Sequence, residues 1–199
     1  ANQQQHYSAA GDLHPVVRRI LANRSVDLDA GLELNLKNLL PPGQFKDIER
    51  AAERLARAIR DQESVLIVGD YDADGATSTA LAILGLRSMG LREVGYTVPN
   101  RFSYGYGLTI KLAKEIAEAP PELLITVDNG ISSEQGIELL QAQGVDVIVT
   151  DHHLAGETLP PAYAIVNPNQ PGCDFEDKSI AGVGVMFYLL LAVNQVLRD

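Results

Sequence analysis

Short, continuous runs of apolar and β-branched residues alternate with helical segments between residues 65 and 197, and this alternation limits the possible folds most strongly. The apolar runs are residues 65–68, 94–98, 123–127, 145–149 and 164–166. The helical segments are residues 76–89, 109–117, 133–143 and 180–197. Strands that are apolar throughout are typical of parallel sheets covered by helices on both faces. The pattern therefore predicts an α/β fold with a parallel β-sheet of about five strands.

Helical segments also precede the first predicted strand. Residues 14–24 place apolar side chains on one face of a short helix, and a Pro-Pro-Gly break follows at residues 41–43. Between residues 46 and 60, apolar residues recur with helical spacing at positions 48, 51, 52, 55 and 59. We therefore expect residues 1–60 to form a helical N-terminal lead-in and residues 61–199 to form the α/β domain.

Charge and composition exclude several classes of protein. The 199 residues include 16 Lys and Arg but 26 Asp and Glu, which gives a formal net charge of −10. Surfaces that coat nucleic acid are normally basic, but a nuclease remains possible because bound divalent cations reverse the charge of an acidic site. The single cysteine excludes a disulfide framework and a cysteine-rich zinc site. Without a signal peptide or a long apolar run, we expect a cytoplasmic protein that does not enter the membrane.

Acidic and imidazole side chains follow three of the predicted strands at the point where each strand ends. They are Asp70, Asp72, Asp74, Asp128, Asp151, His152 and His153. Because sites in open parallel sheets form at the carboxyl ends of the strands, these side chains converge if the three strands are neighbours. Carboxylates repel one another in a partly desolvated site unless cations neutralise them. The sequence therefore predicts a site for two divalent cations, and the oxygen-rich donors favour Mn²⁺ or Mg²⁺.

Each of these residues has a simpler interpretation when it is taken alone. Asp128 could cap a helix, and His152 and His153 could be surface histidines. Residues 70–75 match the start of a calcium-binding loop, but the twelfth position of that loop is Leu81 rather than Glu. The haloacid-dehalogenase pattern is a closer alternative, but its scheme includes no Asp-His-His at another strand end. The combination of strand ends therefore favours a metal site.

Three segments resemble the first three motifs of the DHH phosphoesterase superfamily. They are residues 69–80 (GDYDADGATSTA), 127–133 (VDNGISS) and 150–153 (TDHH). Residues 98–108 (VPNRFSYGYGL), 166–173 (VNPNQPGC) and 179–193 (SIAGVGVMFYLLLAV) further resemble the bacterial branch of single-strand-specific exonucleases. This resemblance implies a 5′→3′ exonuclease of DNA repair and recombination that hydrolyses single-stranded DNA by a two-metal mechanism. It also implies a helicase and a single-strand-binding protein as partners.

The resemblance implies a set of metal ligands among the candidate residues. Asp72 would bind one of the two Mn²⁺ or Mg²⁺ ions. Asp74 and His152 would bind the second ion, and Asp128 would bridge the two. A pair of ions placed in this way supplies a nucleophile near neutral pH and stabilises both the attacking and the leaving oxygen of an in-line displacement.

The remaining candidates have supporting roles by the same resemblance. Asp70 and Asp151 would shape the site through hydrogen bonds, with Asp151 outside the ligand set. His153 would contact the scissile phosphate. Arg101, in the loop after the second strand, would bind a substrate phosphate, although a surface arginine is the simpler interpretation.

Three features of the superfamily do not occur in the sequence. They are a fourth motif with a further ligand Asp, the domain called DHHA1, and the OB-like domain of the exonuclease branch. We therefore expect the chain to be a fragment of a longer protein and to stop before the fourth motif. Two alternatives stay open. One is another DHH enzyme acting on nanoRNA, cyclic dinucleotides or pyrophosphate, and the other is a catalytically silent scaffold module.

Overall fold

The computed structural model describes residues 13–24 and 36–199, and the chain divides into two compact units at residue 40. The first unit contains α1 (Pro15–Asn23), whose first turn is capped by the side chain of His14, and η1 (Leu36–Asn38). The second unit begins at Pro41 and includes η2 (Pro42–Gln44) and α2 (Ile48–Asp61). Helix α2, expected in the lead-in of residues 1–60, therefore belongs to the unit that contains the sheet.

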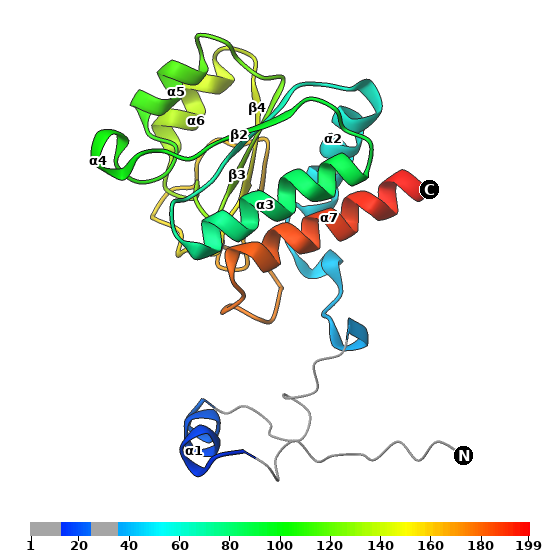
Figure 1. Cartoon of the computed structure of the whole chain (residues 1–199), viewed down its shortest axis with the longest axis vertical. Coiled ribbons are helices and arrows are strands. Elements are labelled where there is room, and N and C mark those ends of the chain that lie inside the picture. Colours follow the sequence, from blue (N-terminus) through cyan, green and yellow to red (C-terminus); the bar gives the residue numbers. More distant parts are fainter. Residues whose placement is uncertain (1–12, 25–35) are drawn as a thin grey trace. The chain divides into compact units, whose positions relative to one another are not determined.

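Five parallel strands form the centre of the second unit (Figure 1). They are β1 (Val65–Val68), β2 (Val94–Thr97), β3 (Leu123–Val127), β4 (Asp146–Thr150) and β5 (Ala164–Val166). Their order across the sheet is β2-β1-β3-β4-β5, and every neighbouring pair is parallel. The predicted α/β fold with a parallel sheet is confirmed. All five residues of β3 are buried, as expected for a central strand covered on both faces.

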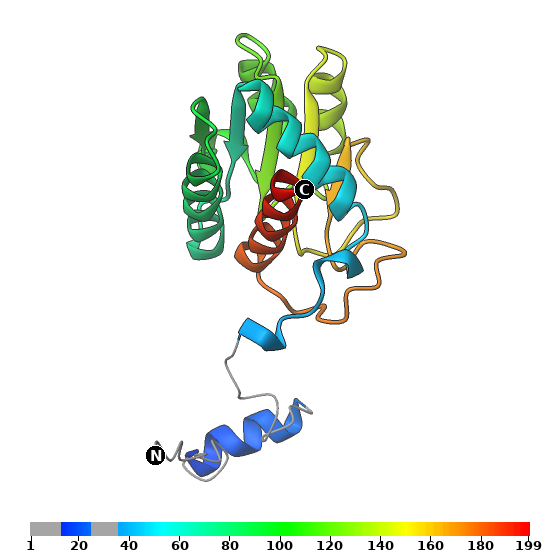
Figure 2. The ribbon, with the colours of Figure 1, turned by 90° about the vertical axis from the view of Figure 1, so that its right-hand side faces the viewer.

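Helices cover both faces of this sheet (Figures 1 and 2). They are α2, α3 (Ala73–Ser88), α5 (Ile110–Ile116), α6 (Glu134–Gln141) and α7 (Gly182–Arg198), and a further short helix, α4 (Arg101–Tyr104), follows β2. Helices α3 and α2 both pack against α7, whereas α5 packs against α6 on the other side. The short helix α4 was not predicted. Helix α3 begins three residues before the predicted start at residue 76, because Asp72 caps it there.

Helix α7 contains the longest apolar run of the sequence. Its inward side chains, among them Val185, Leu189 and Val193, are fully buried against the sheet unit. Near its middle, Tyr188 lies in an aromatic cluster with Phe45 and Phe175, whose rings stack at 3.8 Å. The apolar run therefore serves the core, as predicted. Within residues 13–24 and 36–199, no helix is both long and apolar enough to cross a bilayer.

Candidate metal centre

The three strands that precede the acidic motifs lie side by side in the sheet. Strand β3 pairs with β1 on one side and with β4 on the other, so the carboxyl ends of all three meet at one edge. The chain also changes direction across the sheet between β1 and β3, because β2 lies outside β1. In doubly wound sheets, ligands bind outside the carboxyl ends of the strands at this switch point. The fold therefore places the acidic side chains where a site is expected.

The loop between β1 and α3 carries the first acidic motif in a tight turn. Asp70 is 3% exposed, and its Oδ1 accepts a hydrogen bond from the Tyr71 N–H at 2.7 Å. Asp72 caps α3 by accepting a hydrogen bond from the Gly75 N–H at 2.9 Å. A Cβ on Gly75 would lie 2.5 Å from the Asp70 carbonyl oxygen, so only glycine permits this turn. The sequence Asp-x-Asp-x-Asp-Gly thus folds both carboxylates onto the sheet edge.

Asp74 links this loop to the start of the last helix. Its two carboxylate oxygens accept hydrogen bonds from the Gly182 N–H at 2.7 Å and the Val183 N–H at 2.8 Å. The helix-capping residue Ala181 has no side chain that could satisfy these N–H groups. A carboxylate at this position is also stabilised by the helix dipole. Asp74 therefore fixes α7 against the site, a contact that local sequence pattern does not reveal.

Asp128 lies at the centre of the candidate site. It is 1% exposed, and its backbone is left-handed with φ 61°, which is uncommon for a residue other than glycine. The Nε2 atom of His152 lies 3.1 Å from its Oδ1, yet among the described residues this buried oxygen accepts no hydrogen bond. Burial, followed by the charges of Asp74 and Asp72, raises the pKa of Asp128 to about 8. A buried acceptor of this kind is costly unless a cation or proton joins it.

The end of β4 presents two imidazoles on a shared carboxylate. Asp151 is 1% exposed, and its Oδ2 accepts the Ile131 N–H at 2.9 Å. Its Oδ1 accepts the backbone N–H groups of His152 at 2.7 Å and of His153 at 3.1 Å. The same oxygen lies 2.7 Å from Nδ1 of His153, and this hydrogen bond chiefly raises the pKa of that imidazole to about 8. Asp151 therefore orients both histidines and keeps His153 cationic near neutral pH.

Two groups of side chains place their donor atoms within 4.8 Å of one another and could each hold a cation. One group is Asp70, Asp72 and Asp128, and the other is Asp128, His152 and His153. Asp128 belongs to both groups, which is the arrangement that a bridging ligand requires. Asp74 belongs to neither group, although its Oδ2 lies 3.6 Å from Nε2 of His152. The oxygen and imidazole donors fit Mn²⁺ or Mg²⁺ better than a structural Zn²⁺.

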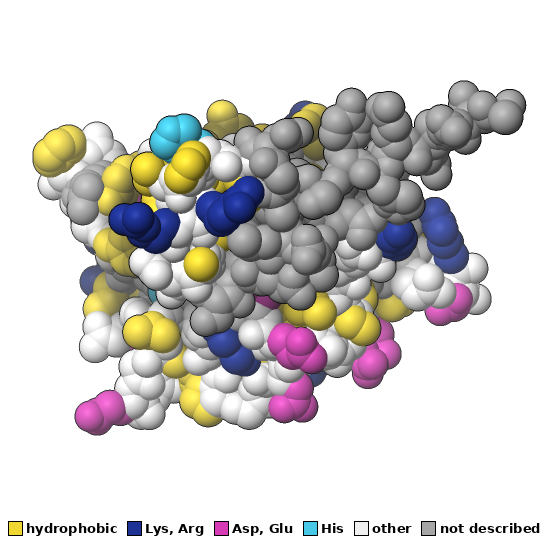
Figure 3. All heavy atoms as spheres, turned by 90° about the horizontal axis from the view of Figure 1, so that it is seen from below, with side chains coloured by type: hydrophobic (Ala, Val, Ile, Leu, Met, Phe, Trp, Pro, Cys, Tyr) yellow, Lys and Arg dark blue, Asp and Glu magenta, His cyan; other side chains and the backbone are white. Residues whose placement is uncertain are grey.

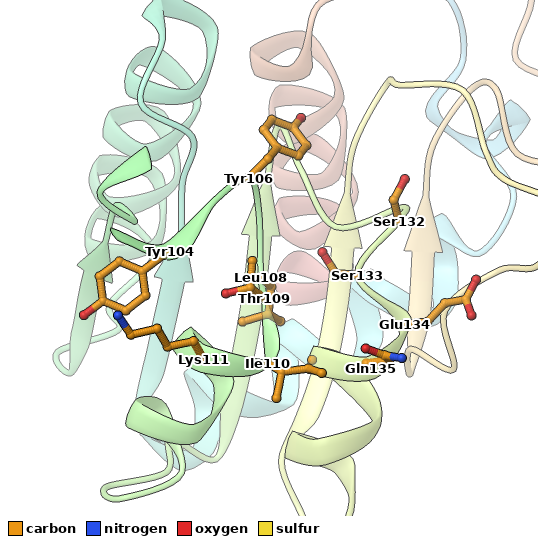
Figure 4. A pocket seen from close by; sticks show the side chains of 11 residues that line it. Tyr104, Tyr106, Leu108, Thr109, Ile110, Lys111, Ser132, Ser133, Glu134 and Gln135 are labelled. Carbon is orange, nitrogen blue, oxygen red and sulfur yellow. The ribbon is translucent and has the colours of Figure 1, made fainter. Parts of the chain in front are cut away.

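An open cavity of about 600 Å³ lies between α4, α5 and the start of α6 (Figure 4), and none of the candidate ligands lines it. Tyr106 lines it, and the Tyr106 hydroxyl donates to the carbonyl oxygen of Asp128 at 3.3 Å. Tyr104 also lines the cavity, but its hydroxyl is bound to Glu115 on α5. Figure 4 shows these two rings well apart. Arg101 begins α4, and its side chain lies outside the described part of the structure.

Sequence reasoning did not identify two asparagines that also reach this edge. Asn167 and Asn169 follow β5 and donate hydrogen bonds to the backbone carbonyls of His153 and His152. The available signal was their position directly after a predicted strand, the same signal that identified the acidic residues. The fifth strand is short, and the sequence does not give its neighbour in the sheet, so this signal is weaker there.

The chain matches the family described as "DHH family, N-terminal domain" over residues 64–198. It is 51% identical to the single-stranded-DNA-specific exonuclease RecJ of Haemophilus influenzae over 94% of its length, covering 32% of that protein. It is 50% identical to RecJ of Escherichia coli, covering 94% of this chain and 33% of that protein. The chain therefore spans about a third of the length of these curated relatives.

A solved structure of exonuclease RecJ bound to manganese has the same fold. It superposes with a TM-score of 0.72 at 38% identity, covering 80% of this chain and 40% of that one. RecJ of Thermus thermophilus in complex with Mn²⁺ gives a TM-score of 0.68 at 33% identity, covering 94% of this chain and 28% of that one. From the family match over its strands and acidic motifs, the chain belongs to the DHH family.

Proposed function

We propose that this chain is the catalytic core of a Mn²⁺- or Mg²⁺-dependent 5′→3′ exonuclease that hydrolyses single-stranded DNA. One observation supports the proposal above the others. The buried carboxylate of Asp128 belongs to two groups of potential ligands, and its Oδ1 accepts no hydrogen bond among the described residues. A buried carboxylate oxygen that lacks a hydrogen-bond donor is suited to binding a cation.

The residues of the chain have separable tasks in this reaction. Asp72 and Asp128 would hold one cation, and Asp74 with His152 would hold the other, with Asp128 shared. When bound, the two cations supply a nucleophile near neutral pH and neutralise charge on the phosphate. Asp70, buried beside them, keeps the loop after β1 in its tight turn. No covalent intermediate with the protein is needed.

His153 is suited to the substrate phosphate. Its Nδ1 is engaged by Asp151 at 2.7 Å, so the proton on this nitrogen is held in place and Nε2 faces away from Asp151. The side chain is 47% exposed and its pKa is about 8, so it is accessible and cationic near neutral pH. The Tyr106 hydroxyl lies 3.5 Å from Nε2, and a cationic imidazole is a good hydrogen-bond donor to a phosphate oxygen. Arg101 remains a candidate for a second phosphate contact.

Single-stranded DNA is the substrate that the relatives' names indicate. In the chain itself, Tyr106 contacts the backbone carbonyl of Asp128 and is 47% exposed, and Phe102, next to Arg101 in the sequence, is 98% exposed. Bases stack on such rings without regard to sequence. Figure 3 shows both basic and acidic side chains of the described residues on the face seen from below. We expect the aromatic residues to contribute to substrate affinity.

Partners and location follow from the same proposal. An exonuclease that degrades only single strands needs those strands to be exposed first. We therefore include a helicase and a single-strand-binding protein as partners. The cytoplasmic location expected from the sequence belongs to this proposal as well.

The test is a cleavage assay with Mn²⁺ on four substrates and a parallel measurement of Mn²⁺ binding. The substrates are a 5′-labelled single-stranded oligonucleotide, its blunt duplex, a linear dinucleotide and a cyclic dinucleotide. We expect mononucleotides to be released from the 5′ end of the single strand, and little cleavage of the other three. Asp128→Asn removes the shared ligand and should abolish cleavage and weaken Mn²⁺ binding. Asp174→Asn, in an exposed loop, is the control and should change neither.

Three results would contradict the proposal in different ways. Preferential cleavage of the linear or cyclic dinucleotide would assign the chain to another DHH phosphodiesterase activity. Saturable Mn²⁺ binding without cleavage of any substrate would favour a silent scaffold module. Cleavage that persists at normal rate in Asp128→Asn would exclude the shared-ligand arrangement.

A further inference from the structure

Two asparagines after β5 reach across to the histidine pair at the end of β4. The hydrogen-bonded pairing of β4 with β5 ends before these residues, at Thr150 and its partner. Beyond that point the Nδ2 of Asn167 donates to the carbonyl oxygen of His153 at 3.0 Å. The Nδ2 of Asn169 donates to the carbonyl oxygen of His152 at 2.6 Å. The two asparagine side chains therefore form hydrogen bonds to the chain that follows β4, beyond the last backbone pair of the β4–β5 ladder.

All four backbone polar groups of the His152-His153 dipeptide are held by side chains. Both N–H groups donate to Oδ1 of Asp151, at 2.7 Å and 3.1 Å. Both carbonyl oxygens accept from the two asparagine amides. This backbone lies beyond the regular ladder, so its position depends on these three side chains. Small shifts in it move two imidazoles at once.

The asparagines themselves are fixed by their surroundings. Oδ1 of Asn167 accepts the Asn169 N–H at 2.7 Å, which leaves Nδ2 of this fully buried residue to face His153. Nδ2 of Asn169 has a second acceptor, the carbonyl oxygen of Lys178, at 3.2 Å. The Nζ of Lys178 in turn donates to the Pro168 carbonyl at 2.7 Å, and the proline ring limits the backbone between the two asparagines. The amide orientations therefore follow from the partners.

We propose that Asn167 and Asn169 are positioning residues that hold the His152-His153 backbone, and so both imidazoles, in the geometry that the metal centre requires. The inference rests on the proposed function, because it concerns the same site. Partners in the outer shell of a metal site typically change metal affinity by about 10- to 100-fold when they are removed. We expect an effect of this size on Mn²⁺ affinity from either asparagine.

One substitution at Asn169 distinguishes loss of positioning from a change in charge. Asn169→Asp keeps the shape of the side chain but replaces the donor with an acceptor that cannot bond the His152 carbonyl. An added carboxylate near a cation site would, by charge alone, strengthen cation binding. Loss of positioning would weaken it. The two explanations therefore predict changes of opposite sign in the same variant.

The experiment measures Mn²⁺ affinity by calorimetry and thermal stability in the presence of a chelator. We expect Asn169→Asp and Asn169→Leu to bind Mn²⁺ about 10- to 100-fold more weakly. Asn169→Gln keeps an amide donor and should lose less affinity than either. The control is Asn194→Asp on α7, which makes the same chemical change at a comparably half-buried asparagine. Asn194 lies about 18 Å along the helix from its start at the site, so its substitution should leave Mn²⁺ affinity unchanged.

A second readout does not depend on the metal. In metal-free protein, the imidazole nitrogen signals of His152 and His153 report ring position by NMR. We expect Asn169→Asp to move the signals of both rings and Asn194→Asp to leave them unchanged. Because Asn169→Gln retains the donor, it provides a folded comparison if Asn169→Asp loses stability.

The outcomes separate this inference from the proposed function. Unchanged Mn²⁺ affinity and unmoved imidazole signals in folded Asn169 variants would overturn the positioning role. Stronger binding in Asn169→Asp with no change in Asn169→Leu would reduce the effect to charge and also overturn it. If the unsubstituted protein bound no Mn²⁺ while the imidazole signals still moved in Asn169→Asp, the metal-dependent function would fail but the positioning of the histidines would stand.

Discussion

The two edges of the sheet both carry buried charge, but they neutralise it differently. At the amino edge, Arg54 on α2 is 4% exposed and forms ion pairs with Asp146 at 2.6 Å and Glu63 at 2.7 Å. Burial alone would lower the pKa of Arg54, but its hydrogen bonds to Asp146 and Glu63 outweigh burial and raise it. This edge therefore contains its own cation. Its charges are balanced within the protein and serve stability.

At the carboxyl edge, imidazoles face the carboxylates. Asp74 and Asp128 face His152, and Asp151 faces His153. Asp128 is as deeply buried as Arg54, but its burial and the charges of Asp74 and Asp72 raise its pKa to about 8. Buried atoms without a hydrogen-bond partner occur at both edges, since Nη1 of Arg54 and Oε2 of Glu63 share this property with Oδ1 of Asp128 among the described residues. The edges differ in their charge balance: a guanidinium faces the carboxylates at the amino edge, whereas several carboxylates meet imidazoles at the carboxyl edge, and such an excess of carboxylates favours a bound cation.

The largest expected effect comes from making the same change at both edges. Asp128→Asn should abolish cleavage and weaken Mn²⁺ binding by more than about 100-fold, because it removes a ligand rather than a supporting partner. Asp146→Asn should leave Mn²⁺ affinity unchanged but lower the free energy of unfolding, because it breaks an ion pair with Arg54. Calorimetric Mn²⁺ titration and urea unfolding of both variants measure the two effects. Equal loss of Mn²⁺ binding in both would remove the distinction between the edges.

A large effect on stability is expected at the amino edge alone. Arg54→Leu leaves Glu63 and Asp146 without their buried cation and should cost about 3–5 kcal/mol in the free energy of unfolding. Arg57→Leu on the same helix is the control, since its side chain is 55% exposed and such pairs contribute about 0–1 kcal/mol. Urea unfolding monitored by circular dichroism distinguishes the two. Similar losses from both variants would mean that burial of Arg54 adds nothing to its ion pairs.

Much of this arrangement could be predicted because it depends on short stretches of sequence. Strands β1, β3 and β5 have the predicted bounds, since each is a continuous run of apolar or β-branched residues that ends at a glycine or a polar residue. Continuous apolar runs also indicated a parallel sheet. The rule that sites form at the carboxyl ends of such strands then placed Asp70, Asp128 and Asp151 at one edge. The assignment of individual ligand roles remains a prediction.

The rest depends on contacts between distant residues. Asp74 caps α7 through Gly182, a hydrogen bond across 108 positions that no local pattern encodes. Helix α2 joins the sheet unit because its apolar face packs on α7 and β5, so its membership could not be read from its own sequence. The contact between Asn169 and His152 requires the register of β4 with β5. The sequence pattern predicted where the candidate site lies, whereas the contacts that hold its residues in place depend on tertiary packing.

A moderate effect is expected where α7 approaches the carboxyl edge. A Cβ on Gly182 would lie 2.6 Å from Oδ1 and 2.9 Å from Cβ of Asp128, so rotation of the carboxylate alone cannot relieve the clash. Gly182→Ala should therefore weaken Mn²⁺ binding by about 10-fold and cost about 1–3 kcal/mol in stability. Gly95→Ala on β2 is the control, because its new Cβ would meet only Leu66, at 3.9 Å. Normal Mn²⁺ affinity in Gly182→Ala would show that Asp128 tolerates displacement.

The smallest effect is a pH dependence of stability that the carboxyl edge should show only without metal. The pKa of Asp128 is raised from 3.8, and that of His153 from 6.5, each to about 8 in the folded chain. A group with a raised folded-state pKa stabilises the fold at low pH, and this stabilisation is lost as the pH rises through the folded-state pKa. In chelator, the Tm should therefore fall between about pH 4, near the unfolded-state pKa of Asp128, and about pH 9, with the steepest part above about pH 6.5, where His153 contributes as well.

Asp128→Asn isolates the contribution of Asp128 to this dependence. The amide does not titrate, so the fall in Tm should become shallower, leaving the part due to His153. Saturating Mn²⁺ should likewise make the pH dependence of Tm shallower in the unsubstituted protein, because a bound cation replaces the proton on Asp128 across the whole pH range. Differential scanning calorimetry at each pH, with and without Mn²⁺, measures both effects. An equally steep fall of Tm in Asp128→Asn would show that groups other than Asp128 titrate in this range. It would also mean that a proton on Asp128 does not take the place of the cation in the metal-free protein.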